Sequence, residues 1–205
     1  WLDDQVQVGI TSYDQNTPGQ NLAIGGIDVT LRATAGTYIK LEGARSSGPG
    51  SGEAVSIDGG FTFDARKTSG ERAFARKIEA ALDLADVIPG AEGRIAAFLK
   101  DKDRDFSGPG ELAIARESRE AGVLGAYKFN DYWSGKTKAE LRRDEFRNYK
   151  AVEQNVTYTF DDHWKATVGA RIDDNFVEIP SASRLLNQNG RRADVALRLD
   201  YDSQQ

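Results

Sequence analysis

The sequence predicts an all-β protein in which about ten antiparallel strands follow one another in an up-and-down order. Apolar and polar residues alternate over many short segments, which is the pattern of a strand with one apolar face. Short and long connections alternate between these segments. No run approaches the roughly 18 to 20 apolar residues of a membrane-spanning helix. The 205 residues suffice for one folded domain, so we expect residues 1–205 to form a single domain.

The alternation is clearest in the C-terminal half. Along 133–143, one side of the segment carries Trp133, Gly135, Thr137, Ala139 and Leu141, and the other carries Ser134, Lys136, Lys138, Glu140 and Arg142. The same pattern continues over 152–160, 164–173 and 193–201, and less regularly over 6–10, 23–31, 37–41, 74–84, 93–104 and 116–129. In a strand that crosses a bilayer, only every second residue points toward lipid. A low overall hydropathy is therefore compatible with a membrane location.

The connections between these segments favour a membrane barrel. Short connections are expected at 34–36, 89–90, 130–132 and 161–163, and longer ones at 13–20, 46–72, 105–113 and 174–190, with a shorter one at 146–149. Short periplasmic turns opposite long extracellular loops are typical of bacterial membrane barrels. The alternation requires 46–72 to be one long extracellular loop, although 55–63 could also form a strand.

An internal repeat places aromatic residues beside two of the short turns. Residues 127–133 and 158–164 share a Tyr-x-Phe-x-Asp-x-Trp pattern. This pattern resembles the periplasmic aromatic girdle of Gram-negative outer-membrane β-barrels, in which amphipathic rings lie at the level of the lipid headgroups. The resemblance implies a girdle of Tyr127, Phe129, Trp133, Tyr158, Phe160, Trp164 and Tyr201. Such barrels typically end on an aromatic residue, whereas this chain continues past Tyr201, so strand number stays open.

We therefore predict an antiparallel up-and-down transmembrane β-barrel, complete or part of a larger barrel. The charged side of the strands would face the lumen, with Lys136, Lys138, Glu140, Arg142, Lys165, Arg171, Asp173, Asp194, Arg198 and Asp200. In a narrow barrel these groups would form a salt-bridged plug, and in a wide one they would line water. The alternative is a soluble β-domain or a passenger-like β-solenoid. A sandwich core would normally hold large aromatic residues in mid-strand, and here they lie near turns.

The composition restricts the possible chemistry. Cysteine is absent, and the net charge of −5 argues against a nucleic-acid partner. The chain begins at Trp1 without a leader segment, as a processed protein or a fragment would. His163 is the single histidine and lies in a predicted turn without a nearby nucleophile, so we expect no enzymatic activity and no cofactor.

Two further groups of residues suggest ligands. Asp101, Asp103 and Asp105 resemble the start of a calcium loop, but Phe106 stands where such a loop needs glycine, so a charged strand end is the preferred interpretation. The basic residues Arg143, Arg147, Arg191 and Arg192 fall toward the outer end of the strands. They would contact lipopolysaccharide phosphates, since guanidinium groups bind phosphates well, or else form a solvated rim.

These observations lead to two functional hypotheses. The first is a pore or transport-related barrel of the bacterial outer membrane that passes small polar solutes or ions through a charged lumen. The second is a sealed barrel that anchors a larger protein or assembly in that membrane. The expected partners are outer-membrane lipid and lipopolysaccharide, with other outer-membrane or periplasmic subunits in the second case.

Overall fold

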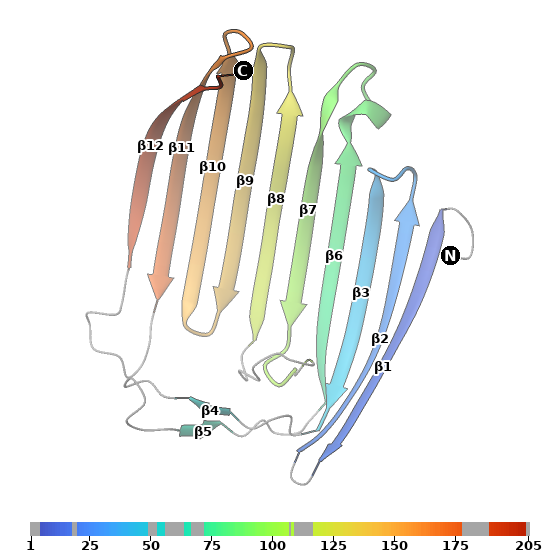
Figure 1. The fold of residues 1–205 in the computed structure, drawn as a ribbon. Helices are drawn as coiled ribbons and strands as arrows, with labels where there is room; N and C mark the ends of the chain where they lie inside the picture. The colour runs from blue at the N-terminus through green and yellow to red at the C-terminus, as the bar shows by residue number, and fades with distance from the viewer. Residues whose placement is uncertain are drawn as a thin grey trace.

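Ten of the strands form one continuous antiparallel sheet in sequence order, shown in Figure 1. The computed structural model describes residues 5–17, 20–48, 53–55, 64–66, 72–106, 108, 117–177 and 189–203. The strand order is β1-β2-β3-β6-β7-β8-β9-β10-β11-β12, and every neighbouring pair is antiparallel. The predicted all-β, up-and-down arrangement of ten strands is therefore confirmed.

The strands of this sheet have similar lengths. They are β1 (Val6–Thr17), β2 (Gln20–Arg32), β3 (Tyr38–Ser47), β6 (Ala73–Asp83), β7 (Glu92–Lys102), β8 (Ser118–Lys128), β9 (Trp133–Asp144), β10 (Arg147–Thr159), β11 (Trp164–Val177) and β12 (Gly190–Tyr201). A single 3₁₀ turn, η1 (Leu84–Asp86), follows β6. No helix among the described residues has the length and apolar character to cross a membrane.

Two very short strands lie in the region expected to be one long loop, 46–72. They are β4 (Glu53–Val55) and β5 (Asp64–Arg66), which pair with each other and not with the ten-stranded sheet. Of the possible strand over 55–63, only Val55 belongs to the described residues. The connection between β3 and β6 therefore contains a small separate hairpin.

Several strands extend further than their alternating patterns. β1 continues to Thr17 and β2 begins at Gln20, so the long connection expected over 13–20 is mostly strand. Likewise β11 continues to Val177, and β10 begins at Arg147 within the expected connection 146–149. Backbone hydrogen bonds do not require an apolar side chain, so the pairing continues beyond the last apolar residue of each strand.

The pairing register separates the side chains into two faces. Residues that stand opposite each other on neighbouring strands form a row across the sheet, and all side chains of one row point to the same side. One face, called the apolar face below, contains Val8, Ile10, Ile27, Val29, Leu31, Ile39, Leu41, Ile78, Ala80, Leu82, Ile95, Ala97, Leu99, Ala121, Val123, Ala139, Leu141, Val152, Val156, Val168, Ala170, Ile172, Val195, Leu197 and Leu199. The opposite face carries most of the charged residues of the strands and is called the charged face.

The sheet has almost no buried core. The buried side chains among the described residues are Leu22, Ile24, Ser46, Ala73, Ala81 and Asp173, and the register places all six on the charged face. The apolar face, in contrast, is exposed: Ile10 on β1 is 83% exposed and Val195 on β12 is 80% exposed. The charged face is thus the more occluded side of the sheet, and the apolar face is open to its surroundings.

The first and last strands are the two edges of the sheet. β1 pairs with β2, β12 pairs with β11, and the described residues of β1 and β12 do not pair with each other. Successive strands alternate in direction, so the first and tenth strands of the sheet run antiparallel. Closure by these two edges would continue the antiparallel pattern, and an even strand number is the rule in bacterial barrels. Closure into a barrel stays a prediction.

Candidate functional site: the charged face

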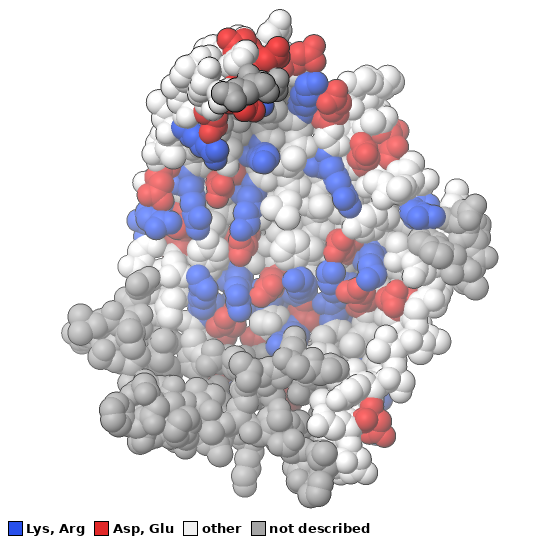
Figure 2. Space-filling view, viewed as in Figure 1, with Lys and Arg blue, Asp and Glu red and all other residues white. Residues whose placement is uncertain are grey.

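All ten charged residues predicted to share one side of the sheet do so. They lie on β9, β11 and β12, and the register across β10 places all of them on the charged face, namely Lys136, Lys138, Glu140, Arg142, Lys165, Arg171, Asp173, Asp194, Arg198 and Asp200. Figure 2 shows this face with basic and acidic side chains intermixed rather than segregated. The alternation in the sequence therefore identified which side chains share a face.

An ion-pair ladder crosses β3 and β6. The Lys77 Nζ atom lies 2.8 Å from Glu79 Oε2 and 3.6 Å from Glu42 Oε2, and Glu42 also pairs with Lys40. The Tyr38 hydroxyl donates to Glu79 at 2.6 Å. Each carboxylate in this group is thus in contact with at least one cation or donor, as a partly desolvated charge requires.

A second ladder crosses β7, β8 and β9. Glu120 bridges two strands, since one of its oxygens lies 3.8 Å from Lys100 Nζ and the other 3.4 Å from Arg142 Nε. Arg142 in turn lies 3.8 Å from Asp144. On β9 itself, Lys138 Nζ is 2.8 Å from Glu140. These contacts place each of the charged groups Lys100, Glu120, Arg142 and Asp144 within 4.0 Å of an opposite charge.

Asp173 is the most buried carboxylate on the charged face, with 8% of its surface exposed. Its two oxygens lie 3.8 Å from Arg171 Nε and 3.4 Å from Arg192 Nε. Arg192 also pairs with Asp194 at 2.8 Å. A buried carboxylate is stable only when it is paired, so Arg171 and Arg192 make the burial of Asp173 possible.

The predicted girdle residues gather at the end of the sheet that carries the short turns. Trp133 stands directly opposite Tyr158, with ring centroids 4.7 Å apart, and Trp164 stands opposite Tyr201, with centroids 4.8 Å apart. The Phe129 ring packs edge-on against Tyr127 at 4.9 Å, and Phe160 packs against Tyr158 at 4.8 Å. The seven residues thus form three contact groups along one end of the apolar face.

The two copies of the sequence repeat also fold into the same turn. The Asn130 side chain accepts from the backbone N–H of Tyr132 (2.9 Å) and Trp133 (2.8 Å), and Asp161 accepts from His163 and Trp164 (both 2.8 Å). These hydrogen bonds lower the pKa of Asp161 below its ordinary value. Sequence reasoning missed this role, although an Asn or Asp before the turn in both copies was the available signal.

The turn between β2 and β3 uses a threonine in the same way. The Thr34 hydroxyl accepts from the N–H groups of Gly36 (3.2 Å) and Thr37 (3.0 Å), and it donates to Asp86 at 2.6 Å. Thr37 also donates to Asp86, which belongs to η1. These bonds lower the pKa of Asp86. The 3₁₀ turn after β6 therefore fixes the neighbouring turn.

The four arginines predicted to contact lipopolysaccharide do not form one cluster. The register places Arg143 and Arg191 at the long-loop end of the apolar face and places Arg147 and Arg192 on the charged face. Arg147 donates to Asn175 at 3.1 Å, and Arg192 is held by Asp173 and Asp194. The alternation of neighbouring side chains separates Arg191 from Arg192, so only Arg143 and Arg191 share the surface that the prediction needs.

The residues considered for calcium binding and for catalysis have other contacts. Asp101 lies 3.0 Å from Arg119, and Asp103 accepts from the Phe74 N–H at 2.9 Å. Among the described residues, no group of three or more His, Cys, Asp or Glu side chains is arranged to hold a metal. His163 lies in an exposed turn, and its ring stacks on Tyr201 with centroids 6.1 Å apart.

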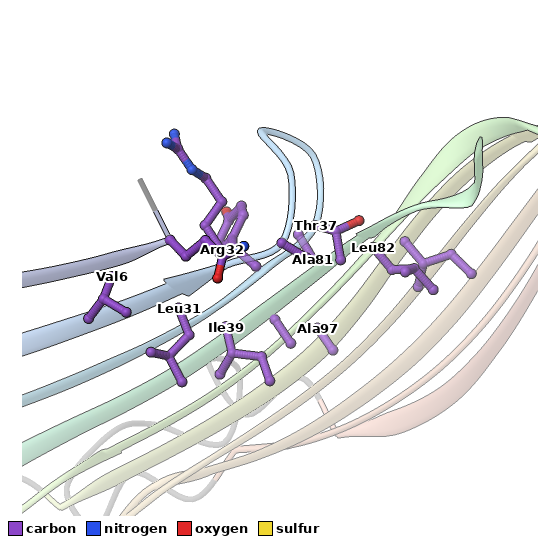
Figure 3. A pocket seen from close by; sticks show the side chains of 13 residues that line it. Val6, Leu31, Arg32, Thr37, Ile39, Ala81, Leu82 and Ala97 are labelled. Carbon is purple, nitrogen blue, oxygen red and sulfur yellow. The ribbon is translucent and has the colours of Figure 1, made fainter. Parts of the chain in front are cut away.

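The apolar face carries two features that the sequence did not reveal. A shallow groove of about 630 Å³ lies near the short-turn end of β1 to β7, where Val6, Leu31 and Ile39 project to one side of the sheet and Arg32 to the other (Figure 3). On β8 to β10, Gln154 accepts from the hydroxyls of Tyr127 (3.3 Å) and Thr137, so the polar groups of this face satisfy one another.

No protein-family model matches the chain, and the searches of curated proteins and of solved structures found no similar protein or structure. The functional conclusion therefore depends on the two faces of the sheet and on the residues that line them.

Proposed function

We propose that this chain forms a transmembrane β-barrel of the bacterial outer membrane and serves passage of small polar solutes or ions. The observation that carries the proposal is the apolar face, which extends over all ten strands and is exposed on each of them. Soluble proteins rarely leave a contiguous apolar surface larger than a few hundred Å² uncovered. No second layer of described residues packs on this face, so lipid is the environment that suits it.

The height of the apolar face supports the same conclusion. On β11 it extends from Trp164 to Ile172, eight residue steps. At about 3.3 Å per residue and a tilt of about 40°, this corresponds to roughly 20 Å along the membrane normal, close to the ~25 Å band of outer-membrane barrels. Aromatic pairs bound the band at the short-turn end, where a headgroup region would lie.

Closure is necessary for this proposal, because unpaired backbone groups cost several kcal/mol each in hydrocarbon. β1 and β12 must therefore pair with each other or with further strands. The two edges run antiparallel, which supports direct pairing. Closure of these ten strands alone would give a narrow barrel, and additional strands would give a wider one.

The charged face then lines the lumen. Its mixture of Lys, Arg, Asp and Glu provides a path for ions and small polar solutes, whereas a hydrocarbon-facing position would be costly for each charge. The ion-pair ladders favour the second candidate, a sealed barrel that anchors a larger assembly, because linked charges can fill a narrow interior. The cations on this face that form no ion pair with a described residue, such as Lys136, favour passage.

Conductance of the refolded chain in a planar bilayer separates the two candidates. The chain is first refolded into vesicles, and a strand-rich circular dichroism spectrum with heat-modifiable gel migration identifies the folded form. For a pore we expect discrete conductance steps, and Lys136→Glu on the charged face should shift the reversal potential toward cation selectivity. Lys150→Glu, on the apolar-face side of β10, is the matched control and should leave selectivity unchanged.

A folded, membrane-inserted chain without conductance would support the anchoring barrel. Folding in plain buffer without lipid or detergent would contradict both candidates, because an apolar face of this extent would then have to be covered by protein.

The proposed barrel would contact lipopolysaccharide through Arg143 and Arg191. Both lie on the apolar-face side near the long-loop end, and neither makes an ion pair with another described residue. Replacing both with Ala should weaken retention of lipopolysaccharide, since phosphates lose two guanidinium donors. Replacement of Arg147 and Arg192, which point to the charged face, is the matched control; an equal loss in both double variants would contradict a direct contact.

A further inference from the structure

From the charged face we infer a binding site for small organic carboxylates with an apolar body, located on β7, β8 and β9. This inference rests on the proposed function, because it names the class of solute that the charged face would recognise. The site is a cavity of about 560 Å³, a size suited to a small ligand. Its lining combines an apolar floor with two cations, Arg94 and Lys136, that form no ion pair with a described residue.

The two cations stand in one row. Arg94 on β7 and Lys136 on β9 lie on either side of Ala126 on β8, and all three point to the charged face. Neighbouring strands are about 4.8 Å apart, so roughly 10 Å separates the two backbones. The small side chain of Ala126 leaves the space between them open. Both long side chains can therefore approach one anion from opposite sides.

Neither cation is neutralised by a carboxylate of the described chain. Arg94 donates to the Tyr38 hydroxyl at 3.3 Å and lies over its ring at 5.6 Å, and Lys136 makes no ion pair with a described residue. Other cations of the same face, such as Lys77, Arg142 and Arg171, are each within 4.0 Å of a carboxylate. The cavity thus has two cations that form no ion pair with a described residue, on a face where ion pairs are usual.

The floor of the cavity is apolar. Ala96 and Leu124 are paired in the row next to Arg94 and Ala126, and Leu124 is 48% exposed. Tyr13 is the other exposed large hydrophobic residue that the described strands present on the charged face. An exposed leucine beside two free cations suits a ligand with an apolar body and a carboxylate, because the guanidinium fork binds both carboxylate oxygens.

The carboxylates in the lining do not favour a cationic ligand. Glu79 already accepts from Tyr38 and pairs with Lys77, and Glu153 accepts from Asn155 at 2.8 Å and lies 3.9 Å from Arg171. Lys138, which stands opposite Leu124, is paired with Glu140. The groups available to a ligand are therefore Arg94, Lys136 and the surface of Leu124.

Calorimetric titration of the detergent-refolded chain with benzoate tests the site. Arg94→Gln and Lys136→Gln should each weaken benzoate binding about tenfold or more, the loss expected for a charge-assisted hydrogen bond. Leu124→Asn, which keeps the number of heavy side-chain atoms but makes the side chain polar, should weaken it about threefold to tenfold. Lys165→Gln is the matched control, because Lys165 is also a charged-face lysine without an ion partner among the described residues but lies outside the cavity.

Two further ligands separate charge from shape. Benzamide keeps the ring without the charge, and acetate keeps the charge without the ring, so each should bind at least tenfold more weakly than benzoate. Equal binding of benzoate and benzamide, or equal losses in Lys136→Gln and Lys165→Gln, would overturn the site. Heat-modifiable migration of every variant shows that a loss is not due to misfolding, and Lys136→Gln decides the question if Arg94→Gln fails to fold.

Conductance recorded on the same preparation distinguishes this inference from the proposed function. Benzoate binding by a chain that does not conduct would retain the site and contradict the pore. A chain that conducts but binds benzoate no more tightly than benzamide would retain the pore and contradict the site.

Discussion

Val123 and Leu124 are neighbours on β8 that point to opposite faces of the sheet. Their exposed fractions are similar, 41% and 48%, and both are aliphatic. Val123 stands between Ala97 and Ala139, whereas Leu124 stands between Ala96 and Lys138. Exposure therefore does not distinguish these two side chains, and the chemistry of their neighbours does. We therefore expect the environment of each face, and not the burial of single residues, to determine what a substitution costs.

The largest expected effect is the difference in stability between an arginine at position 123 and one at position 124. Val123→Arg should destabilise the folded chain in lipid vesicles by about 2–4 kcal/mol, the cost of an arginine near the bilayer midplane. Leu124→Arg should cost less than about 1 kcal/mol, because its side chain would extend into water beside Glu153 and Lys138. Urea unfolding in vesicles, followed by tryptophan fluorescence, measures both. Equal losses would show that both faces have the same environment, and the lipid-facing assignment would then fail.

The hydrogen-bonded group of Tyr127, Thr137 and Gln154 on the apolar face should give a smaller effect. Gln154 accepts from the hydroxyls of Thr137 and Tyr127. Thr137→Val removes one donor and should cost about 1 kcal/mol, since a polar group in an apolar environment loses a partner. Gln154→Leu should cost less than about 0.5 kcal/mol, because Tyr127 and Thr137, 3.1 Å apart, remain bonded to each other. A larger loss for Gln154→Leu than for Thr137→Val would indicate water on this face.

The strand segments could be predicted from the sequence because the apolar face imposes strict alternation wherever it exists. The pattern over 133–143 became β9, and that over 193–201 became most of β12. The ends of strands were harder to predict: residues 13–17 carry no alternating apolar residue, yet they pair with β2. Beyond the apolar band neither side needs an apolar residue, so hydrogen bonding continues after the sequence signal has ended.

The candidate site was only partly predictable. Alternation identified Lys136 and Lys138 as members of one face. It could not show that Arg94 and Lys136 stand on either side of Ala126, because a period of two residues does not fix which residues of neighbouring strands are opposite. The sequence also did not indicate Leu124 as part of the cavity, because an apolar residue at a position of the charged face only interrupts the alternation pattern. The register of the strands, and therefore the cavity, could be determined only from the structure.

The turn between β8 and β9 has the next smaller expected effect. Asn130→Ala removes both hydrogen bonds from its side chain to the Tyr132 and Trp133 N–H groups. We expect a loss of about 1 kcal/mol, the usual net worth of such bonds at an exposed position. Asn130→Asp keeps the acceptor and should stay close to the original stability at neutral pH. Urea unfolding in vesicles measures both variants, and an Ala variant as stable as the Asp variant would show that the turn does not depend on the side chain.

The smallest expected effect is on the stability of the folded chain at acidic pH. Two backbone N–H groups lower the pKa of Asp161 below its ordinary value, so the ionised form is the one the fold prefers. This stabilisation is complete above the unfolded pKa of about 4 and disappears as the pH falls through the lower pKa of the folded chain. Asp161→Asn, which copies Asn130, should therefore reduce the loss of stability below about pH 4, and Asn130→Asp should increase it. Unfolding midpoints measured from pH 6 to pH 2 test both directions, and identical slopes in the two variants would show that the turn carboxylate does not couple folding to protonation.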